Sequence, residues 1–303
     1  MNHSTAMTTS IPEFKTGARR SQILRAILVF AFLVVFALIV LIPFYIIFIT
    51  AFMTEAEAMS TGFSWWPREG FTLAAFDTVL FRDVTGGTAG GSTVMRGFVN
   101  TLIVVIPPTL IGLFTSALSG YAFAKMRFPL KRALFTILLF TMMIPGVIML
   151  VPTFIIYDLL RLTDTYFPLM VPGMFGAAAA VFFLRQYFYG IPTELVESAK
   201  IDGMNHWKIF WKIMVPLSAS ALIAQGILGF VGGYNDFMGP LIYIHSVERW
   251  TLQLALSNMT GMFGSDWSVV AAGTVIALAP MLIIYIIAQR FFIEGIATTG
   301  LKV

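Results

Sequence analysis

The side chains that could carry out chemistry are few in this chain, and they do not form a catalytic set. There is no cysteine, which excludes disulfides, thiol catalysis and cysteine metal sites. The three histidines, His3, His206 and His245, are too scattered to predict a metal site. No histidine, aspartate or serine constellation has catalytic spacing, and the phosphate-binding pattern G-x-x-x-x-G-K-[ST] is missing. The sequence therefore predicts no enzyme activity, cofactor or metal in this chain.

Two carboxylates are notable for their spacing. In the segment ELVESAKIDG, Glu194 and Glu197 are three residues apart, so they share one face of a helix predicted over residues 193–202. Thr193 is its predicted N-cap, and Glu194 falls in the first turn, where the helix dipole favours an anion. The two residues after Glu197 are small, which permits close approach by another surface. Gly203 then allows a left-handed turn.

An aromatic stripe follows that turn. Trp207, Phe210, Trp211 and Met214 recur at the spacing of one helix face, which predicts an amphipathic helix leading into an apolar one. Such a helix could simply rest among lipid headgroups. That alternative explains the preceding carboxylate segment poorly, because residues 193–202 offer little apolar area to lipid. A short helix presented to a protein partner fits them better.

A third polar group lies within an apolar stretch. Tyr234, Asn235 and Asp236 are bracketed by glycines before them and by Gly239 and Pro240 after them. Ionisable groups inside a membrane usually face the helix bundle or a water-filled cavity. These three residues are therefore candidates for a pathway or gate. The alternative is that the helix ends here and the carboxylate of Asp236 is in water.

The elements that position these groups are predicted to be membrane helices. The chain has 303 residues, of which 58% are hydrophobic and 11% are charged, and its mean hydropathy is +0.87. These values are typical of an integral membrane protein. Charge-free windows long enough to cross a bilayer predict an all-α fold with six spans, at residues 26–54, 97–124, 133–157, 165–184, 213–235 and 267–289.

The basic residues predict the orientation of these spans. Of the 19 Lys and Arg residues, 14 lie in the two terminal segments and the alternate loops on their side, and 5 lie in the other loops. By the positive-inside rule, both termini and the segment around Glu194 are cytoplasmic. The glycine-rich stretch at residues 85–93 is then part of the first external loop, residues 55–96.

The segment around Glu197 resembles the EAA loop of ABC importer permeases. Glu197-Ser198-Ala199 stands for the E-A-A triplet, with Gly203 and the run from Ile213 to Pro216 at the family's later positions. The runs NTLIVV, SGYAFAKMRFPLKRALF, YNDFMGPLIYI, RWTLQLAL and QRFFIEGIATTGLKV are similar to the carbohydrate-uptake branch, of the type of the maltose-transporter inner permease subunit.

This resemblance implies a type I importer permease in the cell membrane. Such a permease is surrounded by lipid and binds no nucleic acid. Its implied partners are a second permease, two ATP-binding cassette subunits that hold ATP and Mg, and an extracytoplasmic solute-binding protein. A cytoplasmic segment (1–25), a permease domain (26–292, with the coupling loop at 190–216) and a cytoplasmic tail (293–303) are expected.

The resemblance also implies roles for individual residues. The ATPase-coupling residues would be Glu194, Glu197, Ser198, Ala199, Asp202 and Gly203. The tail residues that contact the ATPases would be Gly295, Thr298, Thr299, Gly300 and Lys302. The loop for the binding protein would contain Arg249, Trp250 and Asp266.

Other functions remain open from the residues. One alternative is an ABC permease for another solute, such as polyamine or phosphate, although the runs YNDFMGPL and QRFFIEGI favour sugar. A self-contained secondary transporter would need intramembrane charge, for which only Asp236 is available. Transporters of that kind often carry an internal repeat, which is not found here.

Overall fold

The computed structural model describes residues 16–60, 64–82, 91–262 and 266–299, and these contain helices and no β-strand. The predicted all-α class is confirmed. Four helical stretches are long and apolar enough to span a membrane, at Gln22–Thr50, Thr93–Lys125, Phe167–Gly190 and Trp267–Gln289. Two further pairs of helices reach the same criterion together but are bent, so the described part of the chain has up to six spans. The glycine-rich stretch at 85–93 lies largely outside the described residues.

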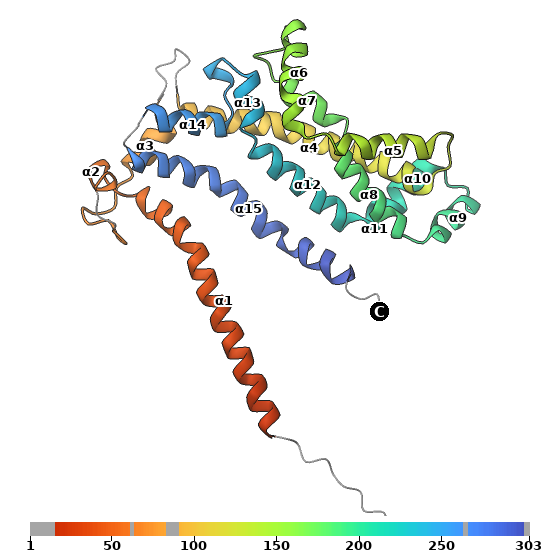
Figure 1. Cartoon of the computed structure of the whole chain (residues 1–303), viewed down its shortest axis with the longest axis horizontal. Helices are drawn as coiled ribbons and strands as arrows, with labels where there is room; N and C mark the ends of the chain where they lie inside the picture. Colours follow the sequence, from red (N-terminus) through yellow and green to blue (C-terminus); the bar gives the residue numbers. More distant parts are fainter. Residues whose placement is uncertain (1–15, 61–63, 83–90, 263–265, 300–303) are drawn as a thin grey trace, which may run out of the picture.

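The order of the helices along the chain can be followed by colour in Figure 1. Their bounds are α1 Thr16–Thr50, α2 Glu55–Ala58, α3 Ala74–Phe81, α4 Thr93–Lys125, α5 Lys131–Met142, α6 Gly146–Leu159, α7 Phe167–Met174, α8 Ala178–Gly190, α9 Thr193–Ile201, α10 His206–Ile209, the π-helical turn η1 Phe210–Met214, α11 Val215–Leu217, α12 Ala219–Tyr234, α13 Met238–Tyr243, the 3-10 turn η2 Val247–Arg249, α14 Leu252–Met262 and α15 Trp267–Thr299.

The two bends modify the predicted spans. The window predicted at 133–157 is divided into α5 and α6, which meet at 96°. Pro145 immediately precedes α6, and a proline both lacks the helical N–H and disfavours helix at the residue before it. The window at 213–235 likewise turns by 82° between the α10–α11 segment and α12. Ser218 lies at this second bend, with non-helical backbone angles.

Helix α4 is the central element. It runs as one helix of 33 residues through Pro107 and Pro108, and it packs against α7, α8, α12 and α14. Small residues allow this close packing. A Cβ at Gly112 would be 2.3 Å from the carbonyl oxygen of Gly173 in α7. A Cβ at Gly120 would be 3.0 Å from a backbone nitrogen of α8.

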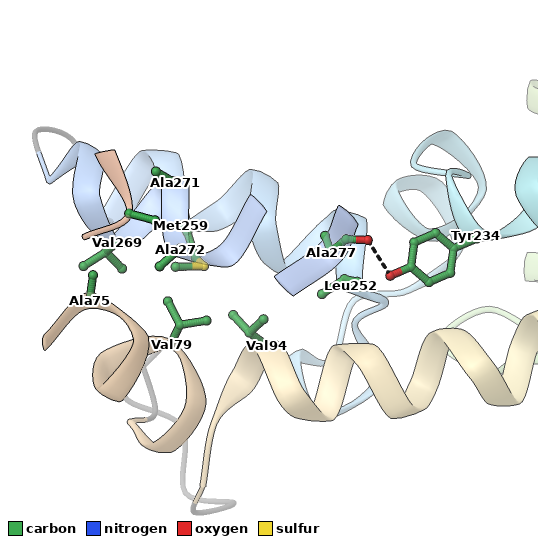
Figure 2. Close-up of a cluster of buried hydrophobic side chains, with 11 residues drawn as sticks. Ala75, Val79, Val94, Tyr234, Leu252, Met259, Val269, Ala271, Ala272 and Ala277 are labelled. Carbon is green, nitrogen blue, oxygen red and sulfur yellow. Dashed lines mark hydrogen bonds between the residues drawn. The ribbon is translucent and has the colours of Figure 1, made fainter. Parts of the chain in front are cut away.

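Two apolar clusters lie at opposite ends of α4. The first joins α3, α14 and α15 to its amino-terminal end, where Val94 is buried (Figure 2). The second joins α8, α9 and α10 to its carboxyl-terminal end, where Tyr121 is buried. We call the amino-terminal end of α4, together with the loop around η2, the η2 end. We call its carboxyl-terminal end the α9 end. Helix α1 contrasts with both, because it projects away from the other helices and its apolar window has no buried residue (Figure 1).

Candidate functional site

The carboxylate segment forms the helix that its sequence predicts. Helix α9 runs from Thr193 to Ile201, with Asp202 as its C-cap. Gly203 has a φ of +78°, so the predicted left-handed turn is confirmed. The N-cap is Pro192 rather than Thr193. The hydroxyl of Thr193 instead accepts a hydrogen bond from the ammonium group of Lys125 at 3.2 Å.

The two faces of α9 differ in chemistry. Its inner face is anchored by Val196 and Ala199, which are 2% and 3% exposed. Its outer face presents the carboxylates of Glu194 and Glu197 together with apolar Ile201, which is 87% exposed. The outer face of α9 therefore combines two carboxylates with one exposed aliphatic side chain.

The placement of Ala199 corrects one expectation. We expected Ala199 and Ser198 to allow a partner to approach closely. Ser198 is exposed, as is Asp202, whereas Ala199 is buried in the cluster that contains Phe188 and Phe210. The small side chain of Ala199 therefore admits the helices of its own chain.

The aromatic stripe after Gly203 is divided between two environments. Phe210 and Met214 are 1% and 0% exposed and belong to the cluster at the α9 end. Trp207 and Trp211 are about half exposed, and both rings contact the ring of Phe114 in α4. The segment is a short helix followed by a π-helical turn rather than one regular amphipathic helix.

At the η2 end, the predicted loop residues make contacts within the chain. The guanidinium of Arg249 donates to the carboxylate of Asp164 at 2.8 Å. The same carboxylate accepts bonds from the backbone N–H groups of His245 and Ser246, at 3.0 and 2.9 Å, and from the Ser246 hydroxyl. Burial raises the pKa of Asp164, but the Ser246 and His245 hydrogen bonds and the Arg249 charge outweigh it and lower that pKa from 3.8 to about 2.

Helix α4 holds the same loop from the other side. The side-chain amide of Asn100 donates to the carbonyl oxygens of Glu248 and Trp250, both at 2.9 Å. The hydroxyl of Thr101 accepts from the backbone N–H of Leu252 at 2.8 Å. Side chains of α4 therefore hold the backbone of this loop at Glu248, Trp250 and Leu252.

Asp266, the third residue predicted for the loop that meets the binding protein, makes hydrogen bonds within this chain. The carboxylate of Asp266 accepts hydrogen bonds from the backbone N–H groups of Ser268 and Val269, at 3.0 and 3.3 Å. These are among the first N–H groups of α15, so Asp266 caps that helix. The expected contact of Asp266 with an external protein is not needed to explain its position.

The pathway candidates separate in the structure. Tyr234 is 1% exposed, and its hydroxyl donates to the carbonyl oxygen of Ala277 in α15 at 2.9 Å (Figure 2). Tyr234 thus joins two helices of this chain and does not line an open surface, which corrects its assignment. Asn235 and Asp236 are exposed, and one oxygen of Asp236 accepts from the N–H of Gly239 at 3.2 Å.

A cavity of about 470 Å³ lies beside Asn235, between α12, α14 and α15. Gln253 and Thr274 add further polar groups to its wall, and Phe237 and Met281 belong to its apolar part. A mixed wall of this kind suits a polar organic solute, since the amides can bond hydroxyl groups and the ring can contact an apolar face. No signal in the sequence indicated Gln253 or Thr274.

The predicted tail that would contact the ATPases is described only in part. Gly295, Thr298 and Thr299 fall in the last turns of α15. Gly300 and Lys302 lie outside the described residues. Within the described residues, no group of three histidine, cysteine or acidic side chains could hold a metal ion.

Residues that the sequence analysis missed hold the α9 end together. Lys125 donates to the carbonyl oxygen of Ile191, and the hydroxyl of Tyr121 lies 2.8 Å from Nδ1 of His206. The four-residue spacing of Tyr121 and Lys125 at the end of a long apolar helix was the available signal. Their partners are more than 60 residues away in the sequence, so pattern reading could not supply them.

Comparison with known proteins identifies the family. The family described as "Binding-protein-dependent transport system inner membrane component" matches residues 109–296, which include α9 and the cavity beside Asn235. The arabinooligosaccharides transport system permease protein AraQ of Bacillus subtilis is 32% identical over 272 residues, covering 89% of this chain and 94% of that protein. The sn-glycerol-3-phosphate transport system permease protein UgpE of Escherichia coli is 30% identical and covers 85% of this chain and 91% of that protein.

A solved structure shows the same fold. It is a bacterial ABC transporter involved in the import of the acidic polysaccharide alginate, and one chain of it matches with a TM-score of 0.75 at 23% identity, over 93% of this chain and 100% of that chain. The predicted type I importer fold is therefore confirmed. With the family match and these two relatives, the chain belongs to the inner membrane components of binding-protein-dependent transport systems, as an ABC transporter permease.

Proposed function

We propose that this chain is one of two permeases in an ATP-driven importer, and that the outer face of α9 docks on a separate ATPase subunit. The observation that carries this proposal is the contrast between the two faces of α9. Val196 anchors the inner face within the chain, while Glu197 and Ile201 are exposed on the outer face. The helix is held in place, yet its outer face has no cover within the described residues.

The chemistry of this face defines the partner surface. An aliphatic side chain as exposed as Ile201 needs an apolar pocket to be buried on association. The carboxylates of Glu194 and Glu197 need basic side chains at the rim of that pocket. The ATPase subunit is therefore expected to present a cleft with an apolar floor and a basic edge. ATP and Mg would be held elsewhere in that ATPase subunit, at a nucleotide site for which this chain has no phosphate-binding loop.

The proposed orientation follows from charge. Both termini and α9 are cytoplasmic, since the segments on that side carry most of the basic residues. The η2 end then faces outward, where Arg249 and Trp250 would meet an extracytoplasmic solute-binding protein. Residues 295–302 would approach the ATPase subunits on the cytoplasmic side.

The proposed substrate is a sugar or oligosaccharide. The arabinooligosaccharides permease aligns over 89% of this chain, and the cavity beside Asn235 combines amide groups with an aromatic ring. A polar solute that is not a sugar is the second candidate, because the sn-glycerol-3-phosphate permease aligns over 85% of the chain. Phe237 favours the sugar, since an aromatic ring can contact the apolar face of a pyranose.

The experiment is purification of the chain in mild detergent, with mass spectrometry of the proteins that accompany it. We expect a second permease and an ATPase in stoichiometric amounts. The purified assembly in liposomes, supplied with ATP inside and the binding protein outside, should then take up labelled oligosaccharide. Competition by excess glycerol phosphate but not by sugars would favour the second candidate. A homo-oligomer without an ATPase would overturn the proposal.

A further inference from the structure

Helix α4 is bonded to the start of α9 and to the first residue of α10, on the far side of the turn that ends α9. Lys125, the last residue of α4, donates from its ammonium group to the carbonyl oxygen of Ile191 at 2.5 Å and to the hydroxyl of Thr193 at 3.2 Å. One turn earlier, the hydroxyl of Tyr121 lies 2.8 Å from Nδ1 of His206. Tyr121 and Lys125 are four residues apart and share one face of α4. The same face therefore holds the start of α9 and the residue that begins α10.

Apolar packing fills the space between these two attachments. Val196 and Ala199 on the inner face of α9 are buried in the same cluster as Tyr121. The ring of Tyr121 lies 5.6 Å from that of Phe210 and 6.4 Å from that of Phe188, between ring centroids. These contacts connect α4 with α8 and η1, and Val196 and Ala199 of α9 pack against the cluster that they form.

The turn at Gly203 would otherwise be a hinge. Its backbone is left-handed, and a Cβ built there meets no atom within 4 Å. A glycine with a positive φ and no contact at its Cβ position is a point where the chain can bend, and the bonds that close this turn are local ones, from the N–H of Gly203 to the carbonyl oxygen of Lys200 at 3.0 Å and from the N–H of Met204 to that of Ala199 at 2.9 Å. The bond between Tyr121 and His206 joins α4 to the far side of this turn. A push on α9 would therefore pass into α4 instead of being absorbed at Gly203.

We propose that Tyr121 and Lys125 are positioning residues that make α9 and α4 one rigid unit, which carries the movement of a docked partner along α4 to the η2 end. The proposal rests on the proposed docking role of α9. Helix α4 has 33 residues, which corresponds to about 50 Å at ~1.5 Å per residue. At its other end Asn100 holds the carbonyl oxygens of Glu248 and Trp250, so one helix contacts both proposed docking regions.

The direct test is a distance measurement by pulsed electron paramagnetic resonance. The chain contains no cysteine, so spin labels can be attached at Lys200→Cys on α9 and Leu110→Cys on α4, both of which are exposed. In the assembled transporter we expect one narrow distance distribution that is the same with and without a non-hydrolysable ATP analogue. In the Tyr121→Phe/Lys125→Met background, the distribution should broaden or shift when the analogue binds.

The matching activity measurement is the number of ATP molecules hydrolysed per solute transported. Each hydrogen bond lost should worsen this ratio by about threefold to tenfold, while the ATPase content of the purified assembly stays unchanged. Conservative variants provide the rescue. Lys125→Arg keeps a cationic donor, and His206→Asn places an amide oxygen near the position of Nδ1. Both should retain near-normal coupling, whereas His206→Leu should resemble Tyr121→Phe.

A label distance that changes with nucleotide in the unmodified background would overturn the proposal, because α9 would then move relative to α4. Normal coupling in the Tyr121→Phe/Lys125→Met variant would overturn it as well. Failure of the proposed function would be distinguishable, since no ATPase would then accompany the unmodified chain. In that case the attachment of α9 to α4 can still be tested without nucleotide. The distance distribution should be narrower in the unmodified chain than in the Tyr121→Phe/Lys125→Met variant.

Discussion

The two ends of α4 hold neighbouring segments in different ways. At the η2 end, the polar groups that fix the loop are paired within the chain, as Asn100 bonds two carbonyl oxygens and Asp164 bonds Arg249. At the α9 end, Tyr121 and Lys125 hold the helix from its inner side, and the outer face remains exposed. In the first region the polar groups of the loop are paired within the chain, whereas in the second the outer face of α9 is held in position and left uncovered by the described residues.

This difference indicates where each end derives its stability. Removing a contact at the η2 end should lower the stability of the chain itself, because buried polar groups would lose their partners. Changing the outer face of α9 should leave the chain folded and weaken an association instead. Variants at the two ends should therefore separate stability from assembly.

The largest effect is expected for Glu197→Lys. If the carboxylate meets a basic group in a partner cleft, charge reversal loses a pair and juxtaposes like charges. Truncating one partner of a buried interfacial pair costs about 2–5 kcal/mol, which is more than a tenfold loss of affinity at about 1.4 kcal/mol per tenfold. The variant should fold and bind the second permease but lose the ATPase in detergent, as measured by gel densitometry of the purified assembly.

The matched control is Lys208→Glu, an equally exposed charge reversal on the adjacent helix. It should retain most of the ATPase. The two variants change the net charge in opposite directions, so equal losses from both would mean that a charge reversal on either helix disturbs assembly and that the effect is not specific to the face of α9.

A smaller effect, on folding, is expected for Asn100→Leu at the η2 end. The carbonyl oxygens of Glu248 and Trp250 would lose their donor, at a cost of about 1–3 kcal/mol for groups left unsatisfied. The apparent melting temperature in detergent should fall while the ATPase content is kept. Asn235→Leu is the control, because the side-chain amide of Asn235 donates to the carbonyl oxygen of Val231 in its own helix and to no other group among the described residues. A similar loss of stability in the control would remove the distinction between the sites.

Asp164→Asn should reveal the contribution of the ionised carboxylate through pH. Because the folded-state pKa is lowered from 3.8 to about 2, the ionised carboxylate stabilises the fold above about pH 4, and this contribution is lost as pH falls through about 2. The variant should be less stable than the parent by about 1–2 kcal/mol at neutral pH, and the gap should close in acid. Thermal unfolding followed across pH measures it; a gap that does not depend on pH would mean that hydrogen bonds, not the charge, are responsible.

The smallest structural effect is expected for Asp236→Ala. Its one bond within the described residues is to the N–H of Gly239 at 3.2 Å, so the loss of stability should be about 1 kcal/mol or less. Uptake by liposomes should nevertheless fall, if the exposed carboxylate lies on the solute route. Unchanged uptake and unchanged solute-stimulated ATP hydrolysis would place Asp236 at a helix end with no part in transport.

The sequence predicted local features well and long-range contacts poorly. Helix α9 and the turn at Gly203 were predicted because capping, charge at a helix start and glycine flexibility are local properties. The burial of Ala199 and Tyr234 was not, because it depends on helices distant in the sequence. The bend before α6 was underestimated. A charge-free window indicates that a segment is long enough to cross a bilayer, but it does not indicate whether the helix keeps one direction. Charge counts also cannot show that the carboxylate of Asp164 binds the loop around Arg249.

The measurement that tests the docking role of α9 most directly is site-specific cross-linking. A photoactivatable maleimide on Ser198→Cys, in this cysteine-free chain, would label whatever covers the outer face of α9 in native membranes. We predict a cross-link to an ATPase subunit, and no reaction with a membrane-impermeant maleimide applied from outside. Labelling from outside, or cross-links only to lipid or to a second copy of this chain, would contradict the assignment of α9 as the ATPase-docking helix.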